Sequence, residues 1–127
     1  PVAAEIDAIG DLAHENFGPI LHVIRYDKRD LDAVIDAINA TGYGLTMGLH
    51  TRLDGRIGHV TQRARVGNLY VNRNIIGAVV GSQPFGGEGL SGTGPKAGGP
   101  NYLTRFCAER TVTINTAAAG GNVELLA

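Results

Sequence analysis

The sequence has no tryptophan, one methionine, one cysteine and only 6% aromatic residues. The single thiol, Cys107, cannot form an internal disulfide, which favours a reducing compartment and predicts a cytoplasmic protein. No apolar run reaches the roughly 18 residues that a membrane-spanning helix requires, and Pro1 begins no signal-peptide pattern. The net charge is -1, so no basic excess points to nucleic acid or to an anionic membrane surface.

What the sequence does contain is an ordinary share of hydrophobic residues, 43%, and an unusual share of glycine. The 127 residues correspond to one domain or part of one. Nine of the 19 glycines lie between Gly77 and Gly99, which predicts loops where the backbone approaches another group closely. The chain begins without an initiator methionine in a segment that already resembles a strand, so we expect it to have been cut from a longer chain.

Hydrophobic periodicity predicts an α/β layer with a parallel sheet. Leu31, Val34, Ile35 and Ile38 have helical spacing, with Asp30 as the expected N-cap and Gly42 as the stop. A second helix is expected from Asp54, as its N-cap, to about Arg65. Strands are predicted over Val2–Ile6, Ile20–Tyr26 (buried on both faces), Thr46–Thr51, Leu69–Val71 and Glu109–Asn115.

The glycine-rich stretch from Ile75 to Pro100 has almost no helix or strand pattern. A loop of this length inside a compact domain is usually functional or disordered, and its apolar residues argue against disorder. A short helix is expected over Asn101–Ala108, and the small apolar tail from Thr116 to Ala127 is expected to need a partner surface.

One part of this stretch, Gly87 to Gly92, fits the dinucleotide-binding pattern G-x-G-x-x-G literally. That fingerprint requires a strand before it and a helix opening at its third glycine. Here Pro84 precedes it and Gly94-Pro95 follow, which prevents a helix. The pattern therefore indicates a turn-rich structural loop.

Cysteine and histidine patterns suggest no metal site. Cys107 could act as a nucleophile on an aldehyde, but no glycine-rich turn exposes it, and a small buried core residue is the better interpretation. The four histidines show no zinc-ligand spacing. Glu15 stays open at this point: it is either a surface carboxylate beside a turn or an acceptor for sugar hydroxyls, with Phe17 offering a flat face to a ring.

The chain resembles the aldehyde dehydrogenase superfamily through five motifs that occur in the family's order. Within this superfamily the chain resembles the pyrroline-5-carboxylate dehydrogenases, including those of bacterial bifunctional proline-utilisation A proteins. The residues that carry this closer resemblance are Asn72-Arg73-Asn74 and the run from Gly77-Ala78 to Gly87. The five motifs are Glu15-Asn16-Phe17-Gly18-Pro19, Tyr43-Gly44-Leu45-Thr46, Gly67-Asn68-Leu69-Tyr70-Val71-Asn72, Pro84-Phe85-Gly86-Gly87 and Leu90-Ser91-Gly92-Thr93-Gly94.

The resemblance implies a role for five residues. Glu15 would bind the nicotinamide-ribose hydroxyls of NAD, and Phe17 would pack against the nicotinamide. The backbone N–H groups of Gly77 and Ala78 would bind the α-carboxylate of L-glutamate γ-semialdehyde, and Phe85 would pack against its aliphatic part. Glycine suits such an anion site because no Cβ blocks the approach and consecutive N–H groups form an anion nest.

The resemblance further implies attack of a cysteine thiolate on the aldehyde, hydride transfer to NAD and hydrolysis to glutamate. The family's nucleophilic cysteine and base glutamate precede the motif that begins at Glu15, so no catalytic residue is assigned here. Residues 1–108 would be the C-terminal part of the catalytic domain and 109–127 an oligomerisation strand and tail, with the rest of the module and a further subunit as partners. FAD would occur only alongside a proline dehydrogenase domain.

Two other interpretations remain open. One is a non-catalytic domain of this fold that serves assembly or closes a partner's active site. The other is a different aldehyde dehydrogenase subfamily, which the context of Gly77 and Ala78 disfavours.

Overall fold

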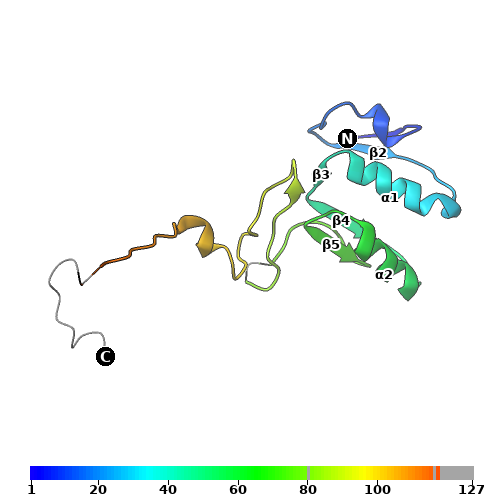
Figure 1. Ribbon diagram of the computed structural model, residues 1–127. Coiled ribbons are helices and arrows are strands. Elements are labelled where there is room, and N and C mark those ends of the chain that lie inside the picture. Colours follow the sequence, from blue (N-terminus) through cyan, green and yellow to red (C-terminus); the bar gives the residue numbers. More distant parts are fainter. Residues whose placement is uncertain (80, 116, 118–127) are drawn as a thin grey trace.

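The computed structural model describes residues 1–79, 81–115 and 117, in which short strands alternate with helices (Figure 1). The strands form three two-stranded sheets, β1 with β2, β3 with β6 and β4 with β5. The elements are β1 Val2–Glu5, β2 Ile20–Val23, α1 Leu31–Ala40, β3 Tyr43–Gly44, β4 Thr46–Leu49, α2 Asp54–Arg63, β5 Asn68–Val71 and β6 Glu88–Gly89, with 3-10 helices at Ile9–Asp11, Lys28–Asp30 and Leu103–Phe106.

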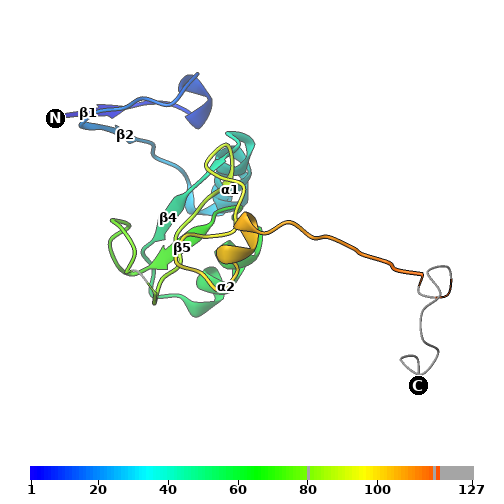
Figure 2. The same cartoon turned by 90° about the vertical axis from the view of Figure 1, so that its left-hand side faces the viewer.

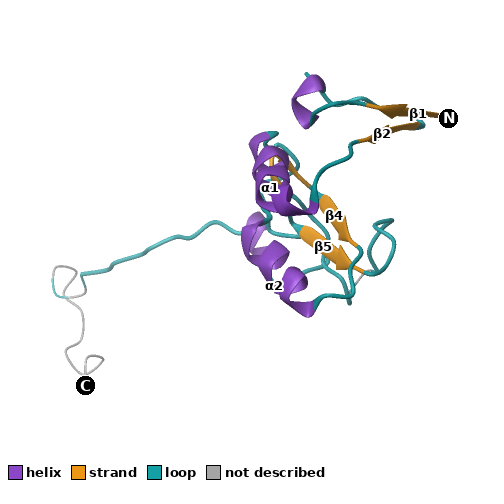
Figure 3. Ribbon diagram, turned by 90° about the vertical axis from the view of Figure 1, so that its right-hand side faces the viewer, coloured by secondary structure: helices purple, strands orange, loops and turns teal. Residues whose placement is uncertain are grey.

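The centre of the fold is the parallel pair of β4 and β5, joined through α2. Figure 3 shows α1 and α2 on the same side of this pair. The buried hydrophobic residues of the described structure are Ile35 from α1, Val60 from α2 and Tyr70 from β5. These three residues form a small core, in which each helix contributes the apolar side of its stripe.

The predicted parallel sheet is present only in part. The β1–β2 and β4–β5 pairs are parallel, whereas β3 and β6 are antiparallel, and the three pairs do not join into one sheet. The strand over Ile20–Tyr26 ends at Val23, and its predicted burial on both faces is wrong: Leu21 is 60% exposed. The reason is that β2 has β1 as its one neighbour and no second layer covers the pair.

Both predicted helices are confirmed, as is the N-cap position of Asp30, whereas the predicted N-cap at Asp54 is wrong. Asp30 is the N-cap residue of α1 and also the last residue of the 3-10 turn that Asp27 caps, and its side chain makes no capping hydrogen bond. Asp54 is the first residue of α2 rather than its cap, where its charge still complements the helix dipole. The stop at Gly42 is as expected, with φ +77° and its N–H donating to the Asn39 carbonyl.

The stretch from Ile75 to Pro100 has little regular structure in its described part, as predicted. The strand β6 pairs with β3, and Phe85 and Ala97 exchange two backbone hydrogen bonds. A Cβ on Gly67 would overlap the Gly86 carbonyl oxygen, so glycine is required where this stretch crosses the start of β5. Close packing of one backbone segment on another accounts for glycine at this position, and no dinucleotide-binding turn has to be invoked.

The C-terminal part differs from expectation in two respects. Residues 101–108 contain a 3-10 helix, but Cys107 at its end is exposed rather than buried. Residues 109–115 form no paired strand, and Val112 and Ile114 are 70% and 74% exposed on a segment that extends away from the body (Figure 2). A strand requires a partner, and none of the described residues pairs with this segment. The predicted tail, 116–127, lies outside the described residues apart from Ala117.

Candidate functional site

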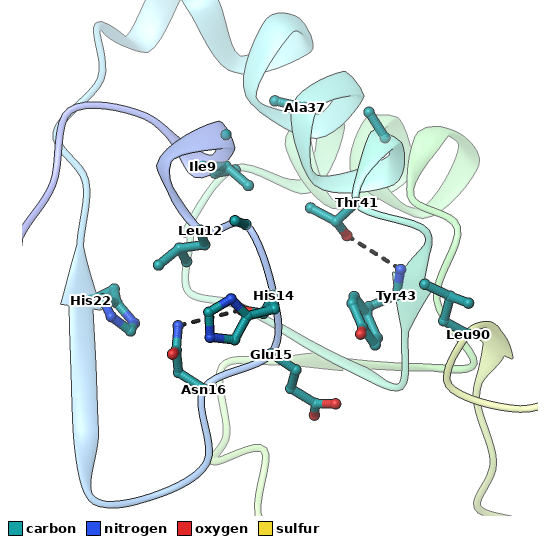
Figure 4. A pocket seen from close by; sticks show the side chains of 13 residues that line it. Ile9, Leu12, His14, Glu15, Asn16, His22, Ala37, Thr41, Tyr43 and Leu90 are labelled. Carbon is teal, nitrogen blue, oxygen red and sulfur yellow. Dashed lines mark hydrogen bonds between the residues drawn. The ribbon is translucent and has the colours of Figure 1, made fainter.

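A pocket of about 570 Å³ lies between the segment before β2, the end of α1, and β3 (Figure 4). Its apolar wall comes from small and aliphatic side chains, and its polar groups converge from three segments. We call it the Glu15 pocket; its lining residues are Ile9, Gly10, Leu12, Ala13, His14, Glu15, Asn16, His22, Ala37, Ala40, Thr41, Tyr43 and Leu90.

Glu15 is the acidic residue of this pocket and also lines a neighbouring one of about 430 Å³. Its carboxylate is exposed and has no hydrogen-bond or ion-pair partner in the described structure. The amide of the next residue, Asn16, donates instead to the His14 carbonyl, 3.3 Å away. An ionised carboxylate only accepts hydrogen bonds, so Glu15 is available to hydroxyl donors from a ligand.

Phe17 does not line the Glu15 pocket. Its ring is 86% exposed, at the turn where Gly18 has φ +133° before β2 begins. An aromatic ring with so much free surface is unusual in a packed domain and offers a flat apolar face to whatever lies beside it.

The loop after β5 holds the two residues predicted to bind a carboxylate. Gly77 has φ +67°, and a Cβ there would have no atom within 4 Å, so the space beside it is open. The backbone N–H groups of Gly77 and Ala78 have no acceptor within the described residues. Two consecutive free N–H groups beside open space are a suitable arrangement for an anion.

Phe85 is half-buried, and its backbone is held by the bridge to Ala97, with N···O distances of 3.0 and 2.9 Å. Neither pocket that Glu15 lines contains Gly77, Ala78 or Phe85. The described structure therefore presents the predicted cofactor residues and the predicted substrate residues as separate groups and does not join them in one cavity.

Sequence reasoning missed two residues that contact the Gly77 loop. The Tyr70 hydroxyl donates to the Gly77 carbonyl at 3.3 Å, and the Arg73 guanidinium lies 4.6 Å from the centre of the Tyr70 ring. Tyr70 belongs to one of the five family motifs, but the only role that the sequence predicted for it is that of a strand residue. Alternation along that strand could have placed its ring on the buried face, but nothing in the sequence identified its partner.

The electrostatic perturbations lie elsewhere. The pKa of Asp32 is lowered because its carboxylate accepts a hydrogen bond from the His59 ring, between α1 and α2. The pKa of Asp27 is lowered by the side-chain hydrogen bond from Arg29. Among the described residues, no three His, Cys, Asp or Glu side chains gather as a metal site would require, and no helix is long and apolar enough to cross a bilayer.

Comparison with known proteins gives consistent results. The profile of the aldehyde dehydrogenase family matches residues 10–112. The chain is 69% identical over 106 residues to the bifunctional protein PutA of Rhizobium meliloti, covering 84% of this chain and 9% of that protein. It is 41% identical over 113 residues to the 1-pyrroline-5-carboxylate dehydrogenase of Bacillus subtilis, covering 88% of this chain and 22% of that protein.

A solved structure shows the same similarity. A mutant of Bradyrhizobium japonicum proline utilization A (PutA) superposes with a TM-score of 0.83 at 63% identity, over 91% of this chain and 12% of that one. The chain thus spans about a tenth of the length of the PutA proteins it matches and about a fifth of the single-function dehydrogenase.

Proposed function

The chain belongs to the aldehyde dehydrogenase family, and from this membership we propose that it is a segment of an NAD-dependent dehydrogenase of proline catabolism. The proposed reaction is the oxidation of L-glutamate γ-semialdehyde, which forms from 1-pyrroline-5-carboxylate, to L-glutamate. The relatives that support this substrate are named PutA and 1-pyrroline-5-carboxylate dehydrogenase. The observation that carries the proposal is the pair of unpartnered N–H groups at Gly77 and Ala78, beside open space.

Glu15 and Phe17 are suited to hold the nicotinamide end of NAD. The carboxylate has no competing partner, so both oxygens can accept hydrogen bonds from ribose hydroxyls. The exposed ring of Phe17 can pack against a flat heteroaromatic group. When bound, NAD accepts the hydride; the role of these residues is to orient it. FAD enters only if the complete protein also carries a proline dehydrogenase domain.

Substrate selection is assigned to the loop after β5. The N–H groups of Gly77 and Ala78 bind the α-carboxylate, and Phe85 contacts the aliphatic part of the substrate. An apolar pocket alone discriminates weakly between similar aldehydes, whereas fixed polar donors reject those that leave them unpaired. The free N–H groups support this assignment because they need an acceptor when the site is closed to water.

The nucleophile is assigned to a part of the complete protein outside this chain. The single cysteine, Cys107, is exposed, follows a 3-10 helix and donates through its Sγ to the Leu103 carbonyl. It lines none of the pockets described above. The isolated chain is therefore not expected to oxidise aldehydes.

The rest of the dehydrogenase module is the proposed partner of this chain. Large apolar side chains are exposed along β1, β2 and the Gly77 loop, including Val2, Leu21 and Ile76, and exposed apolar side chains that lie together are typical of an interaction surface. We assign residues 1–108 to the catalytic domain and 109–127 to an oligomerisation strand and tail in a cytoplasmic homo-oligomer. The exposed Val112 and Ile114 are suited to pairing with another subunit.

The test uses the full-length protein and its Gly77→Val variant, assayed with L-glutamate γ-semialdehyde and with a small neutral aldehyde. At φ +67° valine is strained and its side chain blocks the anion site, so the loss of kcat/KM is expected to be much larger for the semialdehyde. Gly81→Val is the matched control, because Gly81 also has positive φ and free space but no assigned role.

Equal losses for both aldehydes in Gly77→Val would argue against the assignment of the carboxylate site. Absence of NADH formation by the full-length wild type would favour the alternative, a non-catalytic domain that serves assembly or closes a partner's active site.

A further inference from the structure

The hydroxyl of Tyr70 makes a contact to which the proposed function assigns no role. Tyr70 is only 7% exposed, and its hydroxyl reaches across from β5 to donate to the Gly77 carbonyl at 3.3 Å. A buried tyrosine hydroxyl usually finds a protein partner because water cannot reach it freely. The bond therefore connects the rigid centre of the fold to the loop that is assigned to the substrate.

The hydrogen bond to the Gly77 carbonyl also affects the direction of the next N–H group, that of Ala78. The carbonyl of Gly77 and the N–H of Ala78 belong to the same planar peptide, in which a trans bond directs the two groups to opposite sides. A donor that holds the carbonyl on the side of β5 therefore directs the Ala78 N–H away from the core. This N–H has no acceptor within the described residues, and a Cβ on the adjacent Gly77 would meet no atom within 4 Å.

The other hydrogen bonds of the loop hold the peptides on either side of this one: after it, the Val79 N–H donates to the Gln83 side chain at 3.4 Å, and the Val79 carbonyl accepts from the Gln83 N–H at 2.8 Å. Ile76 and Val79 are exposed and do not pack against the core. The side chain of Asn74 accepts from the Ile76 N–H at 3.3 Å, which stabilises the turn before Gly77 but not the peptide after it. Glycine itself permits several orientations, so an external donor is needed to select one.

Arg73 holds the tyrosine ring in turn. Its guanidinium lies 4.6 Å from the centre of the Tyr70 ring, and its Nε donates to the Asn74 carbonyl at 3.3 Å. A cation over the ring face attracts the ring electrostatically and adds to the burial that holds it in place.

We infer that Tyr70 is a positioning residue of the dehydrogenase, which orients the Ala78 N–H toward the α-carboxylate of the substrate through its bond to the Gly77 carbonyl. This inference rests on the proposed function. The hydroxyl also polarises the peptide, which strengthens the Ala78 N–H as a donor. Since the carboxylate is bound equally before and during the reaction, the effect should appear in KM and not in kcat.

The experiment compares full-length wild type with Tyr70→Phe, which keeps the buried ring and removes only the hydroxyl. The bond is long for a hydroxyl donor, so we expect a rise of about three- to fivefold in the KM for L-glutamate γ-semialdehyde, with kcat within about twofold. The inhibition constant of L-glutamate, which carries the same α-carboxylate, should rise by the same factor. The KM values for a small neutral aldehyde and for NAD should not change.

Tyr102→Phe is the matched control, because the Tyr102 hydroxyl has no hydrogen-bond partner in the described structure and its ring contact with Phe106 is retained. An unchanged KM and inhibition constant in Tyr70→Phe would overturn the inference, as would an equal loss for both aldehydes, which would indicate a structural role. A wild type that does not prefer the semialdehyde over the neutral aldehyde would instead refute the proposed function, before any variant is considered.

Discussion

Replacing Glu15 by glutamine tests the cofactor assignment most directly. The substitution keeps the size of the side chain and one acceptor oxygen but removes the charge. In the described structure the carboxylate has no partner, so the fold loses no contact, and the stability should change by less than about 0.5 kcal/mol. Any effect on catalysis must then come from the ligand.

The expected magnitude follows from the charge. Hydrogen bonds to a charged group contribute about 1.5–3 kcal/mol, against about 1 kcal/mol for neutral ones. Losing the charge while keeping one acceptor should therefore cost about 1–2 kcal/mol, or roughly a five- to thirtyfold rise in the KM and dissociation constant for NAD. The exposure of Glu15 to solvent places the result toward the lower end of this range.

The assay is steady-state kinetics of the full-length protein with NAD as the varied substrate, together with NAD binding by calorimetry and thermal unfolding. Glu88→Gln serves as the control, because Glu88 is exposed on β6 and lines neither pocket that Glu15 lines. An affinity for NAD that is the same in Glu15→Gln, Glu88→Gln and wild type would refute the assignment of Glu15 as the ribose-binding carboxylate.

Three further predictions follow from the same structure. Gly67→Ala should destabilise the full-length protein by about 1–3 kcal/mol in urea unfolding, because its Cβ overlaps the Gly86 carbonyl, whereas Gly58→Ala, in the middle of α2 with no atom nearby, should be neutral or stabilising. The pKa of Asp32 is lowered by the hydrogen bond from His59. The contribution of this carboxylate to stability is therefore present above its unfolded pKa and is lost as the pH falls through the lower folded pKa. Asp32→Asn should make the free energy of unfolding depend less on pH over that acidic range, and an unchanged pH profile would contradict this. The purified 127-residue chain should produce no NADH from L-glutamate γ-semialdehyde, and measurable turnover would show that the nucleophile lies within it.

The helix α1 illustrates what local pattern can predict. Its apolar residues recur at helical spacing and a glycine follows, so the pattern and the stop signal agree on one answer. The position of the Asp30 cap was predicted correctly, but the cap at Asp54 was wrong by one residue, because the backbone at Leu53, and not the capping preference of the side chain, decides where α2 begins.

Burial was predicted less well than secondary structure, for a physical reason. A run such as Ile20–Val23 is apolar in either of two situations: when both faces are covered by the same chain, or when the covering surface belongs to another part of the protein. The sequence of the run is the same in both. Cys107 was assigned to a core because no glycine-rich turn exposes it, yet it lies exposed after a short helix.

The sequence by itself determined the family, the alternation of strands and helices and the identity of the five residues proposed to bind cofactor and substrate, because these depend on local pattern and on motifs in order. Only the tertiary structure decided that the Gly77 loop is joined to β5 by Tyr70 and that the strands form three separate pairs. Both depend on which groups meet in three dimensions, and such contacts leave no period or spacing in a single sequence.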